Sequence, residues 1–181
     1  PSRTADYPHP IPDSRGIPKA VEESMLLAPY NDLEYVTSLI EDHREELAGV
    51  IVEPFQRIIP PAPGFLEGLR EATRTHDIPL IFDEVVTGFR LAYGGAQEYY
   101  GIEPDLTVFG KALSNGYPGS AVVGRREIFE SGDPRMGATF HGDGLSIAAA
   151  LETIRRLKRD DGIAHLWRIG SLLKDGLTEV F

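Results

Sequence analysis

The segment Leu80-Ile-Phe-Asp-Glu-Val-Val-Thr-Gly-Phe-Arg90 begins as an apolar run and passes directly into two carboxylates, Asp83 and Glu84. The apolar run is too short for a helix and predicts a buried strand. A buried strand that ends in carboxylates delivers them to the carboxyl edge of a parallel sheet, where open α/β folds bind their ligands. A second apolar run, Leu106–Phe109, is followed by Lys111 after one glycine. The two runs therefore predict that a carboxylate and a primary amine are presented from neighbouring strand ends.

This pairing of residue types suits the chemistry of pyridoxal phosphate. That cofactor needs a lysine to hold it as a Schiff base and an acid to keep its pyridinium nitrogen protonated, so that the ring accepts electrons from the substrate carbon. The plainer alternative is that Asp83 caps a turn and Lys111 is an ordinary surface lysine, because aspartate and lysine are mostly exposed in proteins. The residues around the pair decide between these two interpretations.

Four segments in order resemble the class III, fold-type I aminotransferases, a group that includes the glutamate-1-semialdehyde aminomutases. The segments are Val50–Pro54, Ile81–Arg90, Pro104–Pro118 and Thr139–Gly142, and the likeness extends from about Gly16 to Lys158. The resemblance implies a pyridoxal-phosphate enzyme that acts as a homodimer on a small-molecule amino donor and a carbonyl acceptor.

The resemblance also implies roles for single residues. Lys111 matches the lysine that binds the cofactor covalently, and Asp83 matches the acid that contacts the ring nitrogen. Val85 lies two positions after Asp83, on the same face of the strand, and is expected to pack on the ring. Thr139 matches a residue that reaches across the dimer to the phosphate of the neighbouring subunit's cofactor. Glu53 resembles a substrate-pocket glutamate that in some members pairs with an arginine of the small domain.

The branch of the family stays open between three functions. An aminotransferase moves the amino group between two molecules, an aminomutase moves it within one, and a catalytically inactive binding protein keeps only the fold. Val86 stands where several class III aminotransferases carry glutamine, which favours the aminomutase side. Ser114–Pro118 lacks the glycine run typical of the aminomutases, which favours the other side. Glu84 and Arg90 are expected to be structural, Arg90 as an ion-pair partner.

Composition sets the outer limits. Hydrophobic residues at 41% and charged residues at 25% describe an ordinary globular protein, and the net charge of −10 argues against a nucleic-acid partner. The chain has no cysteine, so disulfides and thiolate metal sites are excluded, and its five histidines show no metal-ligand spacing. No apolar run approaches the length of a membrane span. A cytoplasmic enzyme is the expected class.

The chain in order predicts strands that alternate with helices, and therefore a mostly parallel α/β sheet that forms part of a cofactor-binding domain. Residues 1–158 are assigned to this large domain and residues 159–181 to the connection toward a C-terminal small domain, and the chain is expected to be an internal fragment. Strands are expected at Leu47–Glu53, Pro79–Val85, Asp105–Phe109 and Ser120–Gly124, with a possible strand at Met25–Ala28. Helices are expected from Asn31 or Asp32 to Arg44, at Gly64–His76, Leu145–Arg159 and Leu166–Leu177, with a loop or short helix at Gly94–Tyr100.

Overall fold

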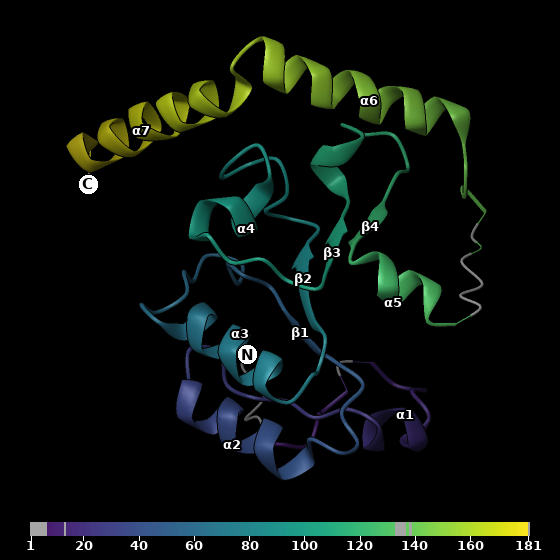
Figure 1. The fold of residues 1–181 in the computed structure, drawn as a ribbon. Helices are drawn as coiled ribbons and strands as arrows, with labels where there is room; N and C mark the ends of the chain where they lie inside the picture. The colour runs from purple at the N-terminus through teal and green to yellow at the C-terminus, as the bar shows by residue number, and fades with distance from the viewer. Residues whose placement is uncertain (1–6, 13, 133–136, 138, 181) are drawn as a thin grey trace.

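The computed structural model describes residues 7–12, 14–132, 137 and 139–180. Its centre is a sheet of four strands in the order β1 (Val50–Val52), β2 (Leu80–Glu84), β3 (Leu106–Phe109) and β4 (Ala121–Gly124) (Figure 1). The first three strands are parallel, and β4 runs antiparallel to β3. The mostly parallel α/β sheet expected from the sequence is therefore confirmed.

Helices connect the strands and extend the chain beyond them. The described helices are α1 (Lys19–Glu23), α2 (Leu33–His43), α3 (Phe65–Thr75), α4 (Gly95–Tyr100), α5 (Arg126–Glu130), α6 (Gly144–Arg159) and α7 (Gly162–Val180), with a 3-10 turn η1 (Lys111–Leu113) after β3. The start of α2 is fixed as predicted, because the Asp32 carboxylate accepts a hydrogen bond from the backbone N–H of Tyr35 at 3.0 Å. Helices α6 and α7 lie together above the strand ends (Figure 1).

The hydrophobic core lies between one face of the sheet and helices α2 and α3. Leu80 and Phe82 of β2 are completely buried there. The residues that pack with them share an apolar character and come from both helices and from the loops that flank β2: Val36, Ile40, Phe65, Leu66, Leu69, Ile78 and Ile102. Burial at every second position of β2 is the pattern of a strand with one covered face.

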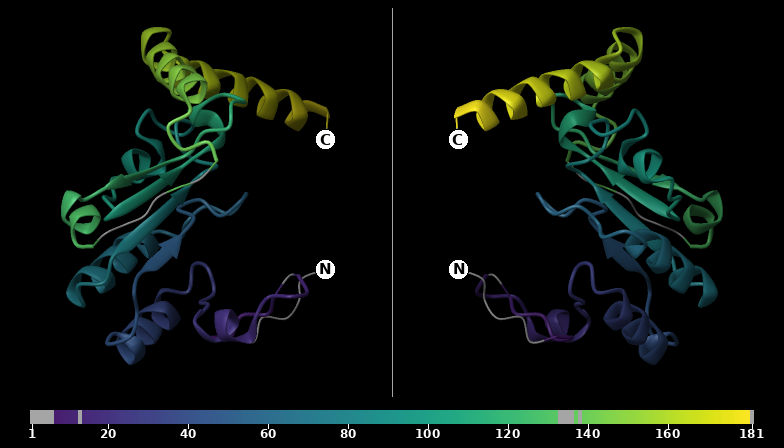
Figure 2. Two further views of the ribbon diagram at one scale, coloured as in Figure 1. Left: turned by 90° about the vertical axis from the view of Figure 1, so that its right-hand side faces the viewer. Right: turned by 90° about the vertical axis from the view of Figure 1, so that its left-hand side faces the viewer.

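The opposite face of the sheet is open. The pairing register places Ile51, Ile81 and Leu106 in one row, and Asp83, Val108 and Val122 in the next. Ile51 is 59% exposed and Val122 is 44% exposed. In Figure 2, helices α2 and α3 lie on one side of the sheet, while α7 projects toward the other side. Asp83 therefore belongs to the uncovered face.

Several expected boundaries differ from the structure. Met25–Ala28 is not a strand: the backbone N–H of Leu27 donates to Pro8 of the N-terminal loop at 2.8 Å, and no ladder forms. The first strand is shorter than Leu47–Glu53, and the last helix begins at Gly162 rather than near Leu166. The short helices α1 and α5 are additional to the helices expected from the sequence, and neither buries a residue.

No described helix combines the length and the apolar character that a membrane crossing requires. Within the same part of the chain, no group of three or more His, Asp or Glu side chains is arranged to hold a metal ion.

Candidate active site

The site expected from the sequence lies at the carboxyl edge of β2 and β3. Asp83 pairs with Val108 in the parallel ladder, and Glu84 pairs with Phe109. Lys111 follows at the first position of η1. Because the two strands are parallel neighbours, Asp83 and Lys111 emerge at the same edge, as the sequence predicts.

One carboxylate oxygen of Asp83 accepts a hydrogen bond from a described residue, and the other does not. Oδ1 accepts a hydrogen bond from the backbone N–H of Val85 at 3.0 Å, a short turn that fixes the direction of the carboxylate. Oδ2 accepts no hydrogen bond from any residue that the structure describes. The side chain is half-buried. A half-buried carboxylate oxygen without a protein donor is suited to receive an N–H group from a ligand.

The side chain of Val85, just after β2, lies against Gly110, just after β3. A Cβ atom built on Gly110 would lie 3.4 Å from Cγ1 of Val85 and 3.7 Å from Cγ2, which is van der Waals contact. The side chain of Val85 thus lies against the peptide that immediately precedes Lys111. Asp83, Val85 and Lys111 are therefore brought together by the fold.

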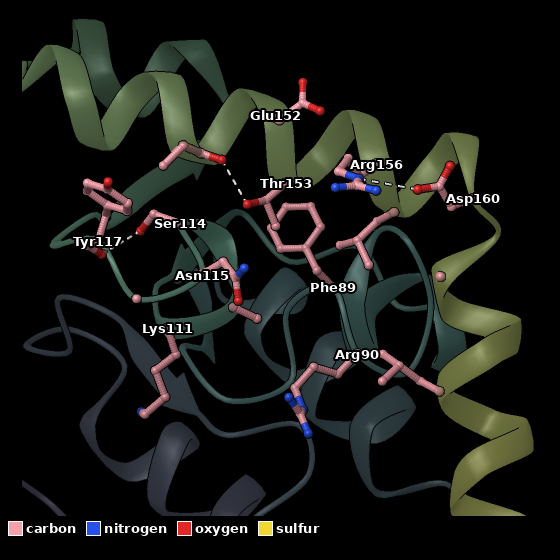
Figure 3. Close-up of a pocket in the computed structure, with 16 residues that line it drawn as sticks. Phe89, Arg90, Lys111, Ser114, Asn115, Tyr117, Glu152, Thr153, Arg156 and Asp160 are labelled. Atoms are coloured by element: carbon pink, nitrogen blue, oxygen red, sulfur yellow. Dashed lines mark hydrogen bonds and ion pairs between the residues drawn. The ribbon is translucent and has the colours of Figure 1, made fainter.

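Lys111 is held in an unusual backbone conformation. Its φ of 41° lies in the left-handed region, where residues other than glycine are uncommon. Such strain persists when the surroundings enforce it, and it often accompanies functional residues. The side chain is exposed, extends away from α6, and forms no ion pair with a described residue (Figure 3). Its amine is accordingly free to react.

The turn after Lys111 is anchored by a buried serine. Ser114 is fully buried, and its hydroxyl donates to the carbonyl oxygen of Tyr117 at 2.8 Å. Asn115 and Gly116, with φ values of 48° and 103°, make the tight reversal that brings Tyr117 back to Ser114. The anchor closes the loop immediately downstream of the lysine.

Glu84 faces the opposite direction from Asp83, as expected, and lies in a buried hydrogen-bond network. It is completely buried and accepts hydrogen bonds from the hydroxyl of Thr87 at 2.9 Å and from the backbone N–H groups of Ala96 and Gln97 at the start of α4. The sequence alone did not show where these donors come from, because α4 begins eleven positions after Glu84.

The two remaining expected site residues lie in different places. Glu53 follows β1 directly and is half-buried, so it stands at the same edge of the sheet as Asp83. Burial raises the pKa of Tyr30 to about 12, and the negative charge of nearby Glu53 adds a smaller increase. The phenol of Tyr30 therefore keeps its proton and donates a hydrogen bond to the carbonyl oxygen of Pro54. Thr139 is exposed in the segment before α6 and makes no hydrogen bond with a described residue.

A cleft of about 1020 Å³ opens between the Lys111 turn and the helices α6 and α7 (Figure 3). Lys111 and Arg90 line it, but Asp83, Val85 and Glu53 do not. The cleft therefore shares Lys111 with the candidate site, but not Asp83 or Val85. The ion pair expected for Arg90 is not formed with any described residue: Arg90 is exposed, and its backbone N–H bonds to Thr87.

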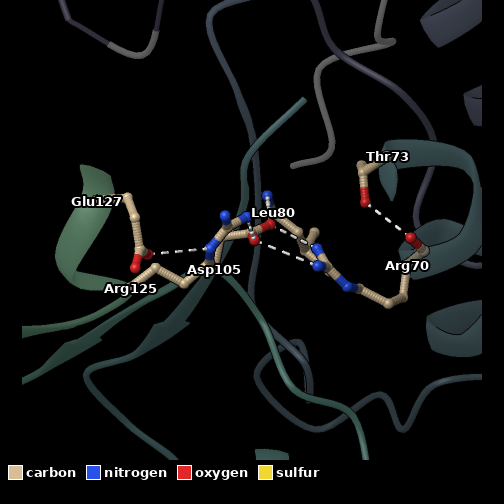
Figure 4. Close-up of polar contacts among 6 residues, drawn as sticks. All are labelled: Arg70, Thr73, Leu80, Asp105, Arg125 and Glu127. Atoms are coloured by element: carbon tan, nitrogen blue, oxygen red, sulfur yellow. Dashed lines mark hydrogen bonds and ion pairs between the residues drawn. The ribbon is translucent and has the colours of Figure 1, made fainter. Parts of the chain in front are cut away.

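The amino edge of the sheet is closed by a separate charged cluster (Figure 4). Asp105, just before β3, is buried and accepts hydrogen bonds from Arg70, from Arg125 at 3.1 Å and from the backbone N–H of Leu80 at 2.8 Å. Burial by itself raises the pKa of Asp105, but the hydrogen bonds from Arg70, Leu80 and Arg125 outweigh it and lower the pKa to about 2. The cluster ties α3 to both β2 and β3 at the end remote from Lys111.

The sequence profile of the class-III aminotransferases matches residues 6–181. The chain belongs to the class-III aminotransferase family. Two curated relatives are similar over 93% of the chain: glutamate-1-semialdehyde 2,1-aminomutase 2 of Brevibacillus brevis at 44% identity, and glutamate-1-semialdehyde 2,1-aminomutase of Methanosarcina acetivorans at 45%. The chain spans 41% and 42% of the lengths of these relatives.

Several solved structures that share this fold are transaminases. An omega-transaminase from Sphaerobacter thermophilus superposes with a TM-score of 0.78 at 40% identity, over 83% of this chain and 36% of that one. The ornithine aminotransferase of Toxoplasma gondii superposes with a TM-score of 0.77 at 30% identity, over 86% of this chain and 38% of the other. A further structure, described as a transaminase with PLP bound, has a TM-score of 0.73 at 29% identity, over 80% of this chain and 36% of that one.

Class-III aminotransferases and the related aminomutases use pyridoxal phosphate, and the residues of this chain fit that cofactor. Asp83 offers an unused carboxylate oxygen to a ring nitrogen, and Lys111 offers an unpaired amine. Between them, the Val85 side chain stands against Gly110 as an apolar surface on which a flat ring can pack.

Proposed function

We propose that the natural polypeptide carrying this chain is a pyridoxal-phosphate-dependent aminotransferase that moves an amino group between a small amine or amino acid and a carbonyl acceptor. The observation that carries the proposal is the pair Asp83 and Lys111, which leave adjacent parallel strands at one edge of the sheet. The amine of Lys111 and one carboxylate oxygen of Asp83 are engaged by no described residue. Membership of the family supports the same reaction class.

Each side chain has a definite task in this proposal. When bound, the cofactor supplies an electron sink that stabilises negative charge at the substrate carbon. Lys111 would hold the cofactor covalently, and its free amine would move the proton at the substrate carbon. Asp83 keeps the proton on the ring nitrogen through a charge-assisted hydrogen bond. Val85 packs against the ring and orients it.

Aminomutase activity is the second candidate. Both curated relatives are named glutamate-1-semialdehyde 2,1-aminomutases, at 44% and 45% identity, whereas the omega-transaminase structure has 40% identity. The cofactor-binding residues serve both reactions equally, because an aminomutase performs the same half-reactions on one molecule. The need for an external amino acceptor separates the two functions.

The remaining parts of the proposal concern assembly and location. Thr139 is exposed, which leaves its hydroxyl free to reach the cofactor phosphate of a second subunit in a homodimer. Glu53 lies at the same sheet edge as Asp83 and is assigned to the substrate pocket. Residues 1–158 are assigned to the large cofactor domain and residues 159–181, most of them in α7, to the connection toward a small domain. The cytoplasm is the proposed location.

The test begins with the purified natural polypeptide and pyridoxal phosphate. Borohydride reduction followed by peptide mapping is expected to place the cofactor on Lys111. A panel of amino donors and one substrate that carries both an amine and an aldehyde, glutamate-1-semialdehyde, is then assayed with and without a keto acid acceptor. A transaminase stalls on the donors without the acceptor, whereas an aminomutase converts the amino aldehyde without it. Absence of a covalent adduct on any lysine, and of turnover on the whole panel, would favour a binding protein that kept only the fold.

A further inference from the structure

We propose that Glu84 is a positioning residue for the cofactor site, and that it acts by fixing the strand ends that carry Asp83 and Lys111. The inference rests on the proposed function, since it assigns a role toward the same bound cofactor. Glu84 lies between Asp83 and Val85 in the chain, and its side chain points to the opposite face of β2. It reaches the site only through the backbone of its two neighbours.

The carboxylate of Glu84 is completely buried, and described residues satisfy both of its oxygens. Oε2 accepts from the Thr87 hydroxyl at 2.9 Å and from the backbone N–H of Ala96. Oε1 accepts from the backbone N–H of Gln97 at 3.0 Å and from Nε2 of the same residue at 3.2 Å. All four of these partners are hydrogen-bond donors. A buried carboxylate with four donors is held in a single orientation.

The chain makes room for this carboxylate at Gly95. A Cβ atom on Gly95 would lie 2.3 Å from Oε2 of Glu84, a distance that no side chain tolerates. Gly95 also has a φ of 83°, which favours glycine independently of the space. The absence of a side chain at Gly95, the first residue of α4, leaves the space that the Glu84 carboxylate occupies, and any side chain there would displace the carboxylate.

The same network reaches β3. Nε2 of Gln97, which donates to Glu84, also donates to the hydroxyl of Thr107 at 3.2 Å. Thr107 lies on β3, directly opposite Phe82 in the ladder. Glu84 of β2 and Thr107 of β3 are therefore bridged by one amide of α4. Asp83 lies on β2 and Lys111 follows β3, so the bridge fixes the relative position of the two strand ends that would hold the cofactor.

Glu84→Gln is the discriminating substitution because it keeps the shape and replaces one acceptor oxygen by an NH₂ donor. If the NH₂ stands at the Oε2 position it faces the N–H of Ala96, and at the Oε1 position it faces the N–H of Gln97. Either orientation leaves two donors opposed. The β2 end must shift to relieve this, and Asp83 and Val85 shift with it.

The experiment uses the natural polypeptide and measures three quantities: the dissociation constant of pyridoxal phosphate, the pH at which the bound cofactor's visible absorption changes, and the melting temperature without cofactor. Asp105→Asn is the matched control, because it disrupts a buried carboxylate at the opposite edge of the sheet. Thr107→Val is a milder second variant that removes only the bridge to β3. It keeps the test usable if Glu84→Gln does not fold.

We expect Glu84→Gln to weaken cofactor binding by about tenfold or more, as loss of an outer partner does for metal ligands, and to move the pH midpoint of the absorption. Thr107→Val should change both quantities in the same direction and by less. Asp105→Asn should lower the melting temperature and leave both quantities near wild type. The inference is overturned if Glu84→Gln binds cofactor with the wild-type constant and midpoint, if Thr107→Val is indistinguishable from wild type, or if Asp105→Asn reproduces the same changes. Failure of the wild type to bind the cofactor at all would instead remove the proposed function.

Discussion

Asp83 and Lys111 leave adjacent parallel strands at the same edge of the sheet, because Asp83 pairs with Val108 and Lys111 comes three positions after Val108. The pairing fixes the separation of the two residues through the backbone. Side-chain contact between them is not required. Their functional groups are therefore left for a ligand, and each can be tested by a separate substitution.

Lys111→Ala is expected to abolish covalent attachment of pyridoxal phosphate and nearly all turnover, because the other described lysines lie in helices α1, α6 and α7 and none of them follows a strand at this sheet edge. The measurement is peptide mapping after borohydride reduction of the natural polypeptide. Lys158→Ala is the control, since Lys158 lies in the last turn of α6, with its amine 5.9 Å from the centre of the Tyr93 ring. An adduct found on a lysine other than Lys111 in the wild type would show that Lys111 is not the residue that binds the cofactor covalently.

Asp83→Asn is expected to retain the cofactor and to slow proton abstraction from the substrate by on the order of 10²-fold, because an amide does not stabilise a protonated ring nitrogen. Single-turnover absorbance with an active amino donor measures the step. Glu103→Gln, an exposed carboxylate beyond α4, is the matched control and should behave as wild type. Wild-type rates in Asp83→Asn would show that Asp83 does not keep the ring nitrogen protonated.

The sequence predicted the sheet well because its signals are local. The short apolar runs of β2 and β3, the Asp32 cap of α2 and the long amphipathic pattern of α6 each depend on neighbouring residues alone. Met25–Ala28 has the same apolar character but no adjacent strand to pair with, so its backbone bonds to Pro8 instead. Pairing partners are a tertiary property that a local run does not contain.

The site was predictable to a similar extent. The motif order indicated Asp83, Val85 and Lys111, and the fold brings them together. The donors of Glu84 were missed, since Ala96 and Gln97 belong to a short helix whose sequence resembles a loop. The arginine partners of Asp105 were missed for the same reason: they come from α3 and from the residue after β4, which only the folded sheet places side by side.

Gly88→Ala is expected to destabilise the protein by about 1–3 kcal/mol, the usual cost of overpacking a filled site. The new methyl group would lie 2.5 Å from Cδ1 of Phe109 and 2.8 Å from the carbonyl oxygen of Glu84. Thermal or denaturant unfolding measures the loss. Gly170→Ala is the control and should instead raise the stability. Its new Cβ would meet nothing within 4 Å, and alanine is the better helix former by about 1 kcal/mol. Equal stability of Gly88→Ala and wild type would contradict this packing.

Asp105 is expected to give the protein an acid-sensitive component of stability. Its pKa in the folded state is lowered from 3.8 to about 2, so its contribution is fully present above about pH 4 and is lost as the pH falls through about 2. Asp105→Asn should cost about 3 kcal/mol at neutral pH, because it leaves Arg70 buried without its partner. Below about pH 2 the variant and the wild type should converge.

Unfolding free energies measured at neutral pH and between about pH 4 and pH 2 check this expectation. Asp77→Asn is the control, because Asp77 is exposed and forms no ion pair with a described residue, and asparagine accepts its φ of 53° readily. A stability difference between Asp105→Asn and wild type that did not shrink toward pH 2 would show that the carboxylate's charge is not the source of the stabilisation.

The 181-residue chain by itself is expected to bind pyridoxal phosphate weakly and to show no measurable transamination. Its described residues build one wall of the site, and the sheet face that carries Asp83 is uncovered, with Ile51 at 59% and Val122 at 44% exposed. Exposed apolar sheet faces associate, so the chain should also form oligomers in sedimentation experiments. Ile51→Lys should reduce this association, whereas Glu103→Lys, which adds positive charge away from the apolar face, should not. Robust turnover of an amino-donor panel by the 181-residue chain would show that the site needs no covering beyond what this chain supplies.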